Sequence, residues 1–180
     1  DYGRIDTEIL YDNLINKFTW GRAKEEDVRL DYYHVRTLTV IRARLSYAKL
    51  AKELVREGDN EKAIEVLDYI MEELPLDKIP WDMFMPDIIE AYFMAGDKED
   101  ALQLIAEMRE YYGETLTYYT SLRPELMMAA DYEIQTSLGY LSRVSGICIN
   151  YGEEALGKDL SDYLQSVYSA YISKTQGGGM

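Results

Sequence analysis

The amino-acid sequence predicts an all-α fold built from stacked pairs of antiparallel helices. The first observation is a repeated segment, GDNEKAIEVL at residues 58–67 and GDKEDALQLI at residues 96–105. The second is a composition with 47% hydrophobic and 29% charged residues but only 4 Pro, which is typical of helix-rich globular proteins. Apolar side chains recur at three- and four-residue steps on both sides of each repeated segment, and this period indicates helices rather than strands.

Length, net charge and the small number of Cys and His residues limit the classes of function that we expect for the chain. A chain of 180 residues has the length of one domain, and no apolar run approaches the roughly 18 residues that a membrane span needs. The net charge of -14 argues against general nucleic-acid binding, although residues 22–56 carry nine Lys/Arg against five Asp/Glu. One Cys and one His leave no internal disulfide and no cluster with zinc spacing, so we expect neither a metal nor another cofactor.

The first helix pair is predicted over residues 33–75. Its first helix has two apolar faces and is opened by Asp31 as an N-cap. Gly58 then supplies the left-handed conformation that ends a helix at low cost, and Asp59 caps the next helix. Ala63 is small where two antiparallel helices must approach closely. The repeated segment therefore ends one helix and begins its partner.

The second helix pair is predicted from Asp82 to residue 119. Here Gly96 and Asp97 form the turn, and Ala101 is the small residue of the second helix. Pro86 is compatible with this start, because the first four backbone N–H groups of a helix have no internal acceptor.

A third helix pair is predicted over residues 131–172, although it lacks the repeated segment. Its turn is expected at Tyr151–Gly152, and a separate short helix is expected near the N-terminus, after Asp6. The predicted domains are residues 1–32, an N-terminal extension; residues 33–172, the repeat domain; and residues 173–180, a disordered tail.

The two copies resemble tetratricopeptide repeats, whose helix pairs recur at roughly 34 residues. The resemblance rests on a large residue, bulky residues three and seven positions later, a Gly and an Ala: Tyr47, Leu50, Leu54, Gly58 and Ala63 in the first copy, and Met85, Ile88, Tyr92, Gly96 and Ala101 in the second. It implies helix pairs stacked into a right-handed superhelix. Ile89 and Gly113 depart from the family, which has a small residue and a closing Pro there, so the second repeat should pack irregularly.

A narrower resemblance covers most of the chain, to about residue 172. The strings GRIDTEILYDNLINKFTWG, IPWDMFMPDIIEAYFMAGD and DYEI are similar to the C-terminal soluble region of a Bacteroidetes family of uncharacterised multi-span membrane proteins. The membrane half of that family looks like protein O-mannosyltransferases of the glycosyltransferase C class. The resemblance implies the extramembrane part of a glycosyltransferase, on the periplasmic side of the inner membrane. It places the catalytic acid and the lipid-linked sugar in the membrane half, so no catalytic residue falls on this sequence.

The beginning of the chain fits the same expectation. It starts at Asp1 without an initiator Met and without a signal-peptide pattern. We therefore expect either a processed protein or a piece of a longer one.

Catalysis by this chain is the weaker hypothesis. Adjacent carboxylates such as Glu72 and Glu73 do not face each other on a helix, and a general acid needs a desolvated pocket. The sole histidine, His34, lies in DYYHVR, and the sequence has no G-x-S-x-G motif that would mark a nucleophile. We expect a non-catalytic domain, with an all-α hydrolase as the remaining enzymatic alternative.

The predicted role is recognition of a protein, a peptide or a glycan acceptor. The first helices of successive pairs should line any groove, which nominates Arg44, Tyr47, Glu90 and Tyr92. The 17 tyrosines include doublets such as Tyr111–Tyr112, in which one ring packs while the other meets solvent. The alternative for these tyrosines, and for the methionines, is a purely packing role. The alternative for the whole chain is a free-standing cytoplasmic tetratricopeptide adaptor that binds a partner peptide.

Overall fold

The computed structural model describes residues 5–31 and 39–176, and within these ranges every regular element is a helix. This confirms the predicted all-α class. The chain divides into two compact units, Asp1–Leu102 and Gln103–Met180. No helix in the described ranges is long and apolar enough to cross a bilayer. The predicted domain boundary at residue 32 stays a prediction.

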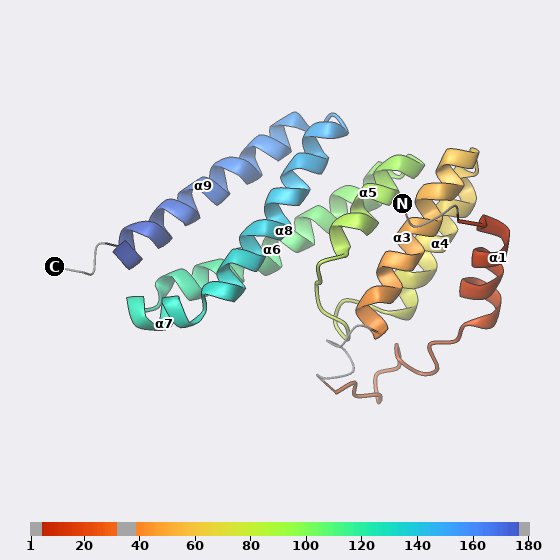
Figure 1. Ribbon diagram of the computed structural model, residues 1–180, viewed down its shortest axis with the longest axis horizontal. Coiled ribbons are helices and arrows are strands. Elements are labelled where there is room, and N and C mark those ends of the chain that lie inside the picture. Colours follow the sequence, from red (N-terminus) through yellow and green to blue (C-terminus); the bar gives the residue numbers. More distant parts are fainter. Residues whose placement is uncertain (1–4, 32–38, 177–180) are drawn as a thin grey trace. The chain divides into compact units, whose positions relative to one another are not determined.

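The first unit is built around three packed helices. Helix α3 (Thr39–Glu57) and helix α4 (Asn60–Glu73) form an antiparallel hairpin, and helix α5 (Met85–Ala95) packs against both of them (Figure 1). The core of the hairpin is fully buried and consists of Tyr47, Ala48, Leu50, Ala51, Ala63, Val66, Leu67 and Ile70. Helix α6 (Lys98–Ser121) begins in this unit and continues into the second.

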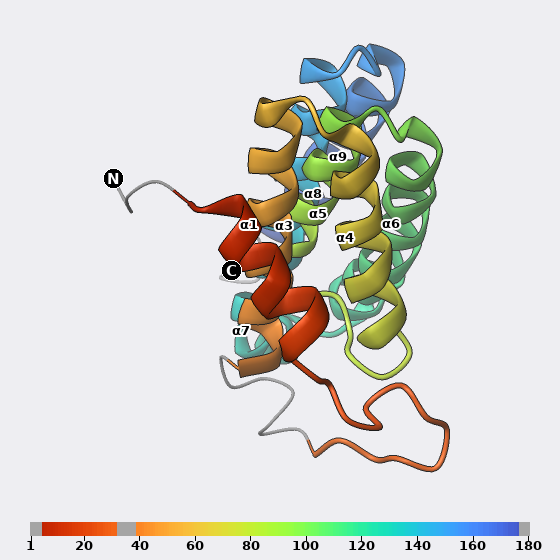
Figure 2. The same cartoon turned by 90° about the vertical axis from the view of Figure 1, so that its right-hand side faces the viewer.

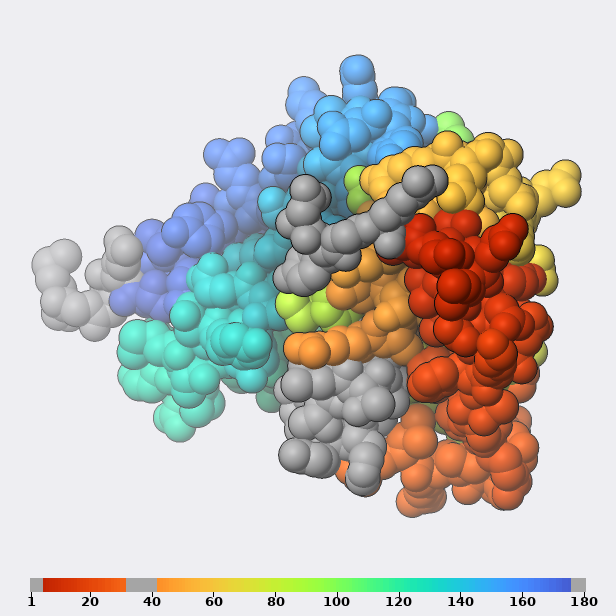
Figure 3. All heavy atoms as spheres, turned by 45° about the vertical axis from the view of Figure 1, so that its right-hand side comes forward, coloured from red at the N-terminus to blue at the C-terminus, as the bar shows by residue number. Residues whose placement is uncertain are grey.

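An N-terminal arm, residues 5–31, completes the first unit. It contains α1 (Thr7–Tyr11) and a π-helix, η1 (Asp12–Lys17), and α1 packs against α3 (Figure 2). Asp6 accepts the N–H of Ile9 at 3.0 Å and so caps α1, which agrees with the short helix expected after Asp6. In Figure 3 the atoms of the arm form a continuous red-to-orange band along the first unit.

The second unit contains a second helix hairpin. After α6, the short helix α7 (Pro124–Ala129) leads into α8 (Asp131–Asn150) and α9 (Glu154–Gln176), which lie antiparallel to each other. The close approach of this hairpin is at Gly157, where an added Cβ would lie 2.6 Å from Cγ1 of Ile149. Ser145 donates a hydrogen bond to the Gly157 carbonyl at 2.7 Å, which ties the two helices at this point.

Three inter-helix turns have the same geometry. Gly58, Gly96 and Gly152 have φ angles of 89°, 91° and 83°, the left-handed conformation that glycine adopts without strain. Each glycine donates its N–H to the carbonyl three residues earlier, at 3.0 to 3.2 Å. The next residue, Asp59, Asp97 or Glu153, donates to the carbonyl five residues earlier. These paired bonds are the Schellman motif, which satisfies the last carbonyls of a helix.

The side chains around these turns are buried at equivalent offsets. Five positions are equivalent around each turn: those eleven, eight, seven and four residues before the glycine, and the one five residues after it. At Gly58 they are Tyr47, Leu50, Ala51, Leu54 and Ala63; at Gly96 they are Met85, Ile88, Ile89, Tyr92 and Ala101; and at Gly152 they are Leu141, Val144, Ser145, Cys148 and Gly157. All of them are buried. The turn at Gly152 therefore has the same burial pattern as the turns at Gly58 and Gly96, although the sequence lacks the repeated segment there.

Several element boundaries differ from the predictions. Helix α5 begins at Met85 rather than near Asp82, because Asp82 is held in the preceding loop. Helix α9 runs to Gln176, so the disordered tail predicted from residue 173 is wrong for its first four residues. The sequence has no Gly or Pro between Gly157 and Gly177, and Lys174 donates to the Thr120 carbonyl at 2.5 Å. The predicted helix start at Tyr33, with His34, lies outside the described residues.

Candidate functional site

Arg44, expected to line a groove, is buried beneath the loop that joins α4 to α5. One guanidinium nitrogen, Nη1, donates to Oδ2 of Asp82 at 2.6 Å and to the Pro80 carbonyl at 3.0 Å. The other, Nη2, donates to the carbonyls of Leu74 at 3.0 Å and Ile79 at 2.8 Å. The Arg44 side chain is 0% exposed, so it cannot touch a ligand at the surface. Its role in this structure is to hold the loop.

Asp82 is the buried partner of this arginine. Its other oxygen accepts the N–H of Phe84 at 2.7 Å. Burial raises the pKa of the Asp82 carboxyl, whereas the neighbouring Arg44 guanidinium lowers it. The loop before α5 is therefore fixed by an ion pair and by backbone hydrogen bonds rather than by apolar packing alone.

Tyr47, the second predicted groove residue, is also buried and contacts the N-terminal arm. Its hydroxyl donates to the Leu14 carbonyl at 2.7 Å and accepts from Nε1 of Trp20 at 3.2 Å. Its ring stacks on Tyr69 with the centroids 6.0 Å apart. Burial raises the pKa of Tyr47 to about 12. Tyr47 thus links the arm to the hairpin and is not free to contact a ligand.

Tyr92 and Glu90, both on α5, differ in exposure. Tyr92 is 2% exposed and its hydroxyl donates to Oδ1 of Asp68 on α4 at 2.8 Å. Burial, and then this hydrogen bond, raise the pKa of Tyr92 above its ordinary value. The Glu90 side chain is 30% exposed and lies 2.5 Å from Nζ of Lys52. Of the four nominated residues, Glu90 is the one that reaches the surface, and the groove itself stays a prediction.

Charged side chains, most of them partly buried, surround Glu90. Lys52 on α3 bridges to Glu90 and, at 3.3 Å, to Asp87 on α5. Lys49 lies one helical turn before Lys52 and is exposed. We call these four residues the α3–α5 face. Because it presents both signs of charge on two rigid helices, it can make directed polar contacts to a peptide or to sugar hydroxyls.

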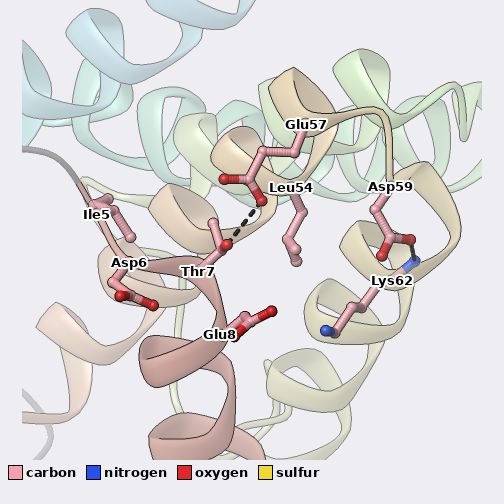
Figure 4. A pocket seen from close by; sticks show the side chains of 8 residues that line it. All are labelled: Ile5, Asp6, Thr7, Glu8, Leu54, Glu57, Asp59 and Lys62. Carbon is pink, nitrogen blue, oxygen red and sulfur yellow. Dashed lines mark hydrogen bonds between the residues drawn. The ribbon is translucent and has the colours of Figure 1, made fainter.

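A separate hollow of about 620 Å³ opens beside the turn at Gly58 (Figure 4). It is lined by Ile5, Asp6, Thr7, Glu8, Leu54, Glu57, Asp59 and Lys62. Asp6 and Asp59 accept helix N–H groups, and Glu57 accepts the Thr7 hydroxyl at 2.7 Å. These carboxylates are exposed and serve the local fold. In the described part of the chain, no three His, Cys, Asp or Glu side chains gather into a possible metal site.

The tyrosine doublet Tyr111–Tyr112 follows the predicted division into one packed and one exposed ring. Tyr111 is 43% exposed, whereas Tyr112 is 5% exposed and packs its ring 5.7 Å from that of Tyr140. The methionines are divided in the same way, since Met85, Met108 and Met127 are buried while Met83 and Met128 are exposed. Packing therefore accounts for part of each set.

Sequence reasoning missed the partners that bury the nominated residues. The sequence pattern predicts Asp82 as a helix start, and it nominates neither Asp68 nor Trp20. The distances between the partners along the chain, 38 residues for Arg44 and Asp82, leave no periodic signal to find them.

No protein-family model, curated protein or solved structure matches this chain.

Proposed function

We propose that the chain is a tetratricopeptide-like interaction domain that recognises a protein or a glycan acceptor and does not itself catalyse a reaction. The observation that carries this proposal is the triple occurrence of one turn, at Gly58, Gly96 and Gly152, with equivalent side chains buried around it. Helix pairs that recur in this way build extended binding surfaces in repeat proteins. A right-handed superhelical stack is part of the proposal.

The α3–α5 face is the proposed contact surface. It lies on the first helices of two successive repeats, which is where the predicted groove would run. The side chains of Lys52, Asp87 and Glu90 are held by ion pairs between α3 and α5, so less of their conformational freedom is lost when a partner binds. The buried residues Arg44, Tyr47 and Tyr92 support this surface from below rather than line it.

The proposal also concerns the longer protein that would contain this domain, which we call the parent protein. On the family resemblance, this domain is the extramembrane part of a membrane glycosyltransferase-like protein, on the periplasmic side. The domain would then hold an acceptor while the membrane half supplies the chemistry. The acidic net charge of -14 agrees with a partner other than nucleic acid.

A selection against two libraries tests the binding role. Peptides displayed on phage and an array of glycans are offered to the full chain, and the equilibrium affinity of each selected ligand is then measured by calorimetry. Lys49→Glu on α3 should weaken binding roughly tenfold or more, because a charge on the contact surface is reversed. The matched control Lys158→Glu, an exposed lysine on α9, should leave the affinity within about twofold. Equal effects of both changes would remove the α3–α5 face from the proposal.

Fractionation of source cells tests the parent protein. An antibody raised against this chain should detect a band much larger than 20.9 kDa in the inner-membrane fraction. A soluble band of the size of this chain would favour the free-standing adaptor instead, while the binding role would remain open to the selection described above.

A further inference from the structure

The first half of the N-terminal arm is attached to the α3–α4 hairpin by polar contacts. Oγ1 of Thr7 donates to Oε2 of Glu57 at 2.7 Å, at the end of α3. The Tyr11 hydroxyl donates to Oε1 of Glu65 on α4 at 2.9 Å, and Nζ of Lys62 lies 4.1 Å above the Tyr11 ring. These contacts place α1 along both helices of the hairpin.

The second half of the arm is attached in the same way. Besides the bonds of Leu14 and Trp20 to Tyr47, Nζ of Lys24 lies 2.6 Å from Glu72 and 2.7 Å from Glu73 at the end of α4. Lys78, in the loop after α4, donates to the carbonyls of Glu25 at 2.5 Å and Val28 at 3.1 Å. The arm is therefore fixed at both ends and in the middle.

The arm covers the hairpin without contributing a buried apolar side chain. Among residues 5–31, all of which the structure describes, Thr7 alone is buried. Ile9 and Phe18 are 61% and 54% exposed, whereas Tyr47 beneath the arm is 0% exposed. Exposed ion pairs and solvent-accessible hydrogen bonds hold a segment weakly, and added salt screens the ion pairs. The arm thus has the contacts of a removable cover rather than those of a core element (Figure 3).

We propose that residues 5–31 are a hinged cover that opens as a unit while α3, α4 and α5 stay folded. Opening breaks the bonds of Leu14 and Trp20 to Tyr47 and uncovers the stacked rings of Tyr47 and Tyr69. The open state is favoured by high ionic strength, because salt screens the ion pairs of Lys24 with Glu72 and Glu73. Opening of the arm is independent of the proposed binding role. When the arm is open, a second surface of the hairpin is exposed.

Hydrogen exchange of the full chain, followed by mass spectrometry at low and at high ionic strength, tests the cover. Amides of the arm that are hydrogen-bonded, such as those of α1 and η1, should exchange at least about tenfold faster than those of α4, since local opening needs less free energy than global unfolding. High salt should speed exchange in the arm while exchange in α8 and α9 changes little.

A matched pair of Tyr→Phe variants separates opening of the arm from loss of stability. Tyr47→Phe keeps the ring but removes the hydroxyl that bonds Leu14 and Trp20, so exchange in the arm should rise about fivefold over the rate in the unchanged chain. Tyr92→Phe removes a hydroxyl that is also buried and whose partner, Asp68, lies on α4, so exchange in the arm should stay within about twofold of the rate in the unchanged chain.

Two results would overturn the cover. One is an arm that exchanges at the rate of α4 at both ionic strengths, because it would then open only when the hairpin unfolds. The other is an equal change in arm exchange for Tyr47→Phe and Tyr92→Phe, because the Tyr47 hydroxyl would then not be what holds the arm closed.

Discussion

Nη1 of Arg44 lies 2.6 Å from Oδ2 of Asp82, and the two side chains are 0% and 5% exposed. A buried charge that loses its partner keeps the cost of its desolvation without compensation. Arg44→Ala should therefore lower the free energy of unfolding by about 3–5 kcal/mol. Lys49→Ala, an exposed lysine on the same helix, should change it by less than about 0.5 kcal/mol. Urea unfolding followed by circular dichroism measures both, and similar values would show that the loop does not depend on Arg44.

The left-handed turn at Gly58 gives a second prediction. Gly58→Ala should lower the free energy of unfolding by about 1 kcal/mol, because alanine is strained at a φ of 89°. Nothing lies within 4 Å of the added Cβ, so the cost is purely conformational. The control Gly139→Ala, in the interior of α8 and equally open, should raise stability by about 0.5–1 kcal/mol. Thermal unfolding distinguishes the two, and a neutral Gly58→Ala would contradict the turn.

Gly157 is required for a different reason, the close approach of α8 and α9. An added Cβ would lie 2.6 Å from Cγ1 of Ile149 and 2.9 Å from the Ser145 carbonyl oxygen, so helices or side chains must shift. Gly157→Ala should cost about 1–3 kcal/mol of stability. Gly146→Ala on α8, whose Cβ meets nothing within 4 Å, is the matched control and should be stabilising. If both alanines stabilise the protein to the same extent, the two helices are not in contact at Gly157.

Stability at alkaline pH should depend on Tyr47. Its pKa is raised by burial from 10.0 to about 12, so the folded state binds this proton more tightly than the unfolded state does. The resulting contribution is fully present below pH 10 and is lost as the pH rises toward 12. Tyr47→Phe, which cannot ionise, should show a smaller fall in the free energy of unfolding over this window. Parallel pH profiles for the two proteins would contradict the burial of the Tyr47 hydroxyl.

The turns were predictable from the sequence because their chemistry is local. At both Gly58 and Gly96, the sequence has a glycine, then an acidic residue, and then an alanine four positions after the acidic residue. Both glycines adopt a positive φ. The same spacing is present from Gly152 to Gly157, where the small residue is another glycine. The helices between the turns follow from the apolar period, and the all-α class follows from the helices.

The candidate site was less predictable because burial depends on distant partners. An arginine is rarely buried, so nothing in the sequence around Arg44 indicates that it lies inside. Its hydrogen-bond acceptors lie far along the chain, and the nearest of them in sequence is the Leu74 carbonyl, 30 residues away. Tyr47 is covered by Leu14 and Trp20, whose arm fits no repeat. Helical period places a residue on a face, but it does not say what covers that face.

The most direct test of the interaction domain is an NMR titration of the ¹⁵N-labelled chain with a ligand from the peptide or glycan selection. The account predicts saturable shift changes concentrated at the amides of α3 and α5 around Lys49, Lys52, Asp87 and Glu90, with α9 unperturbed. Failure of both selections to yield a ligand, or a ligand that perturbs α9 and leaves α3 and α5 unchanged, would contradict it.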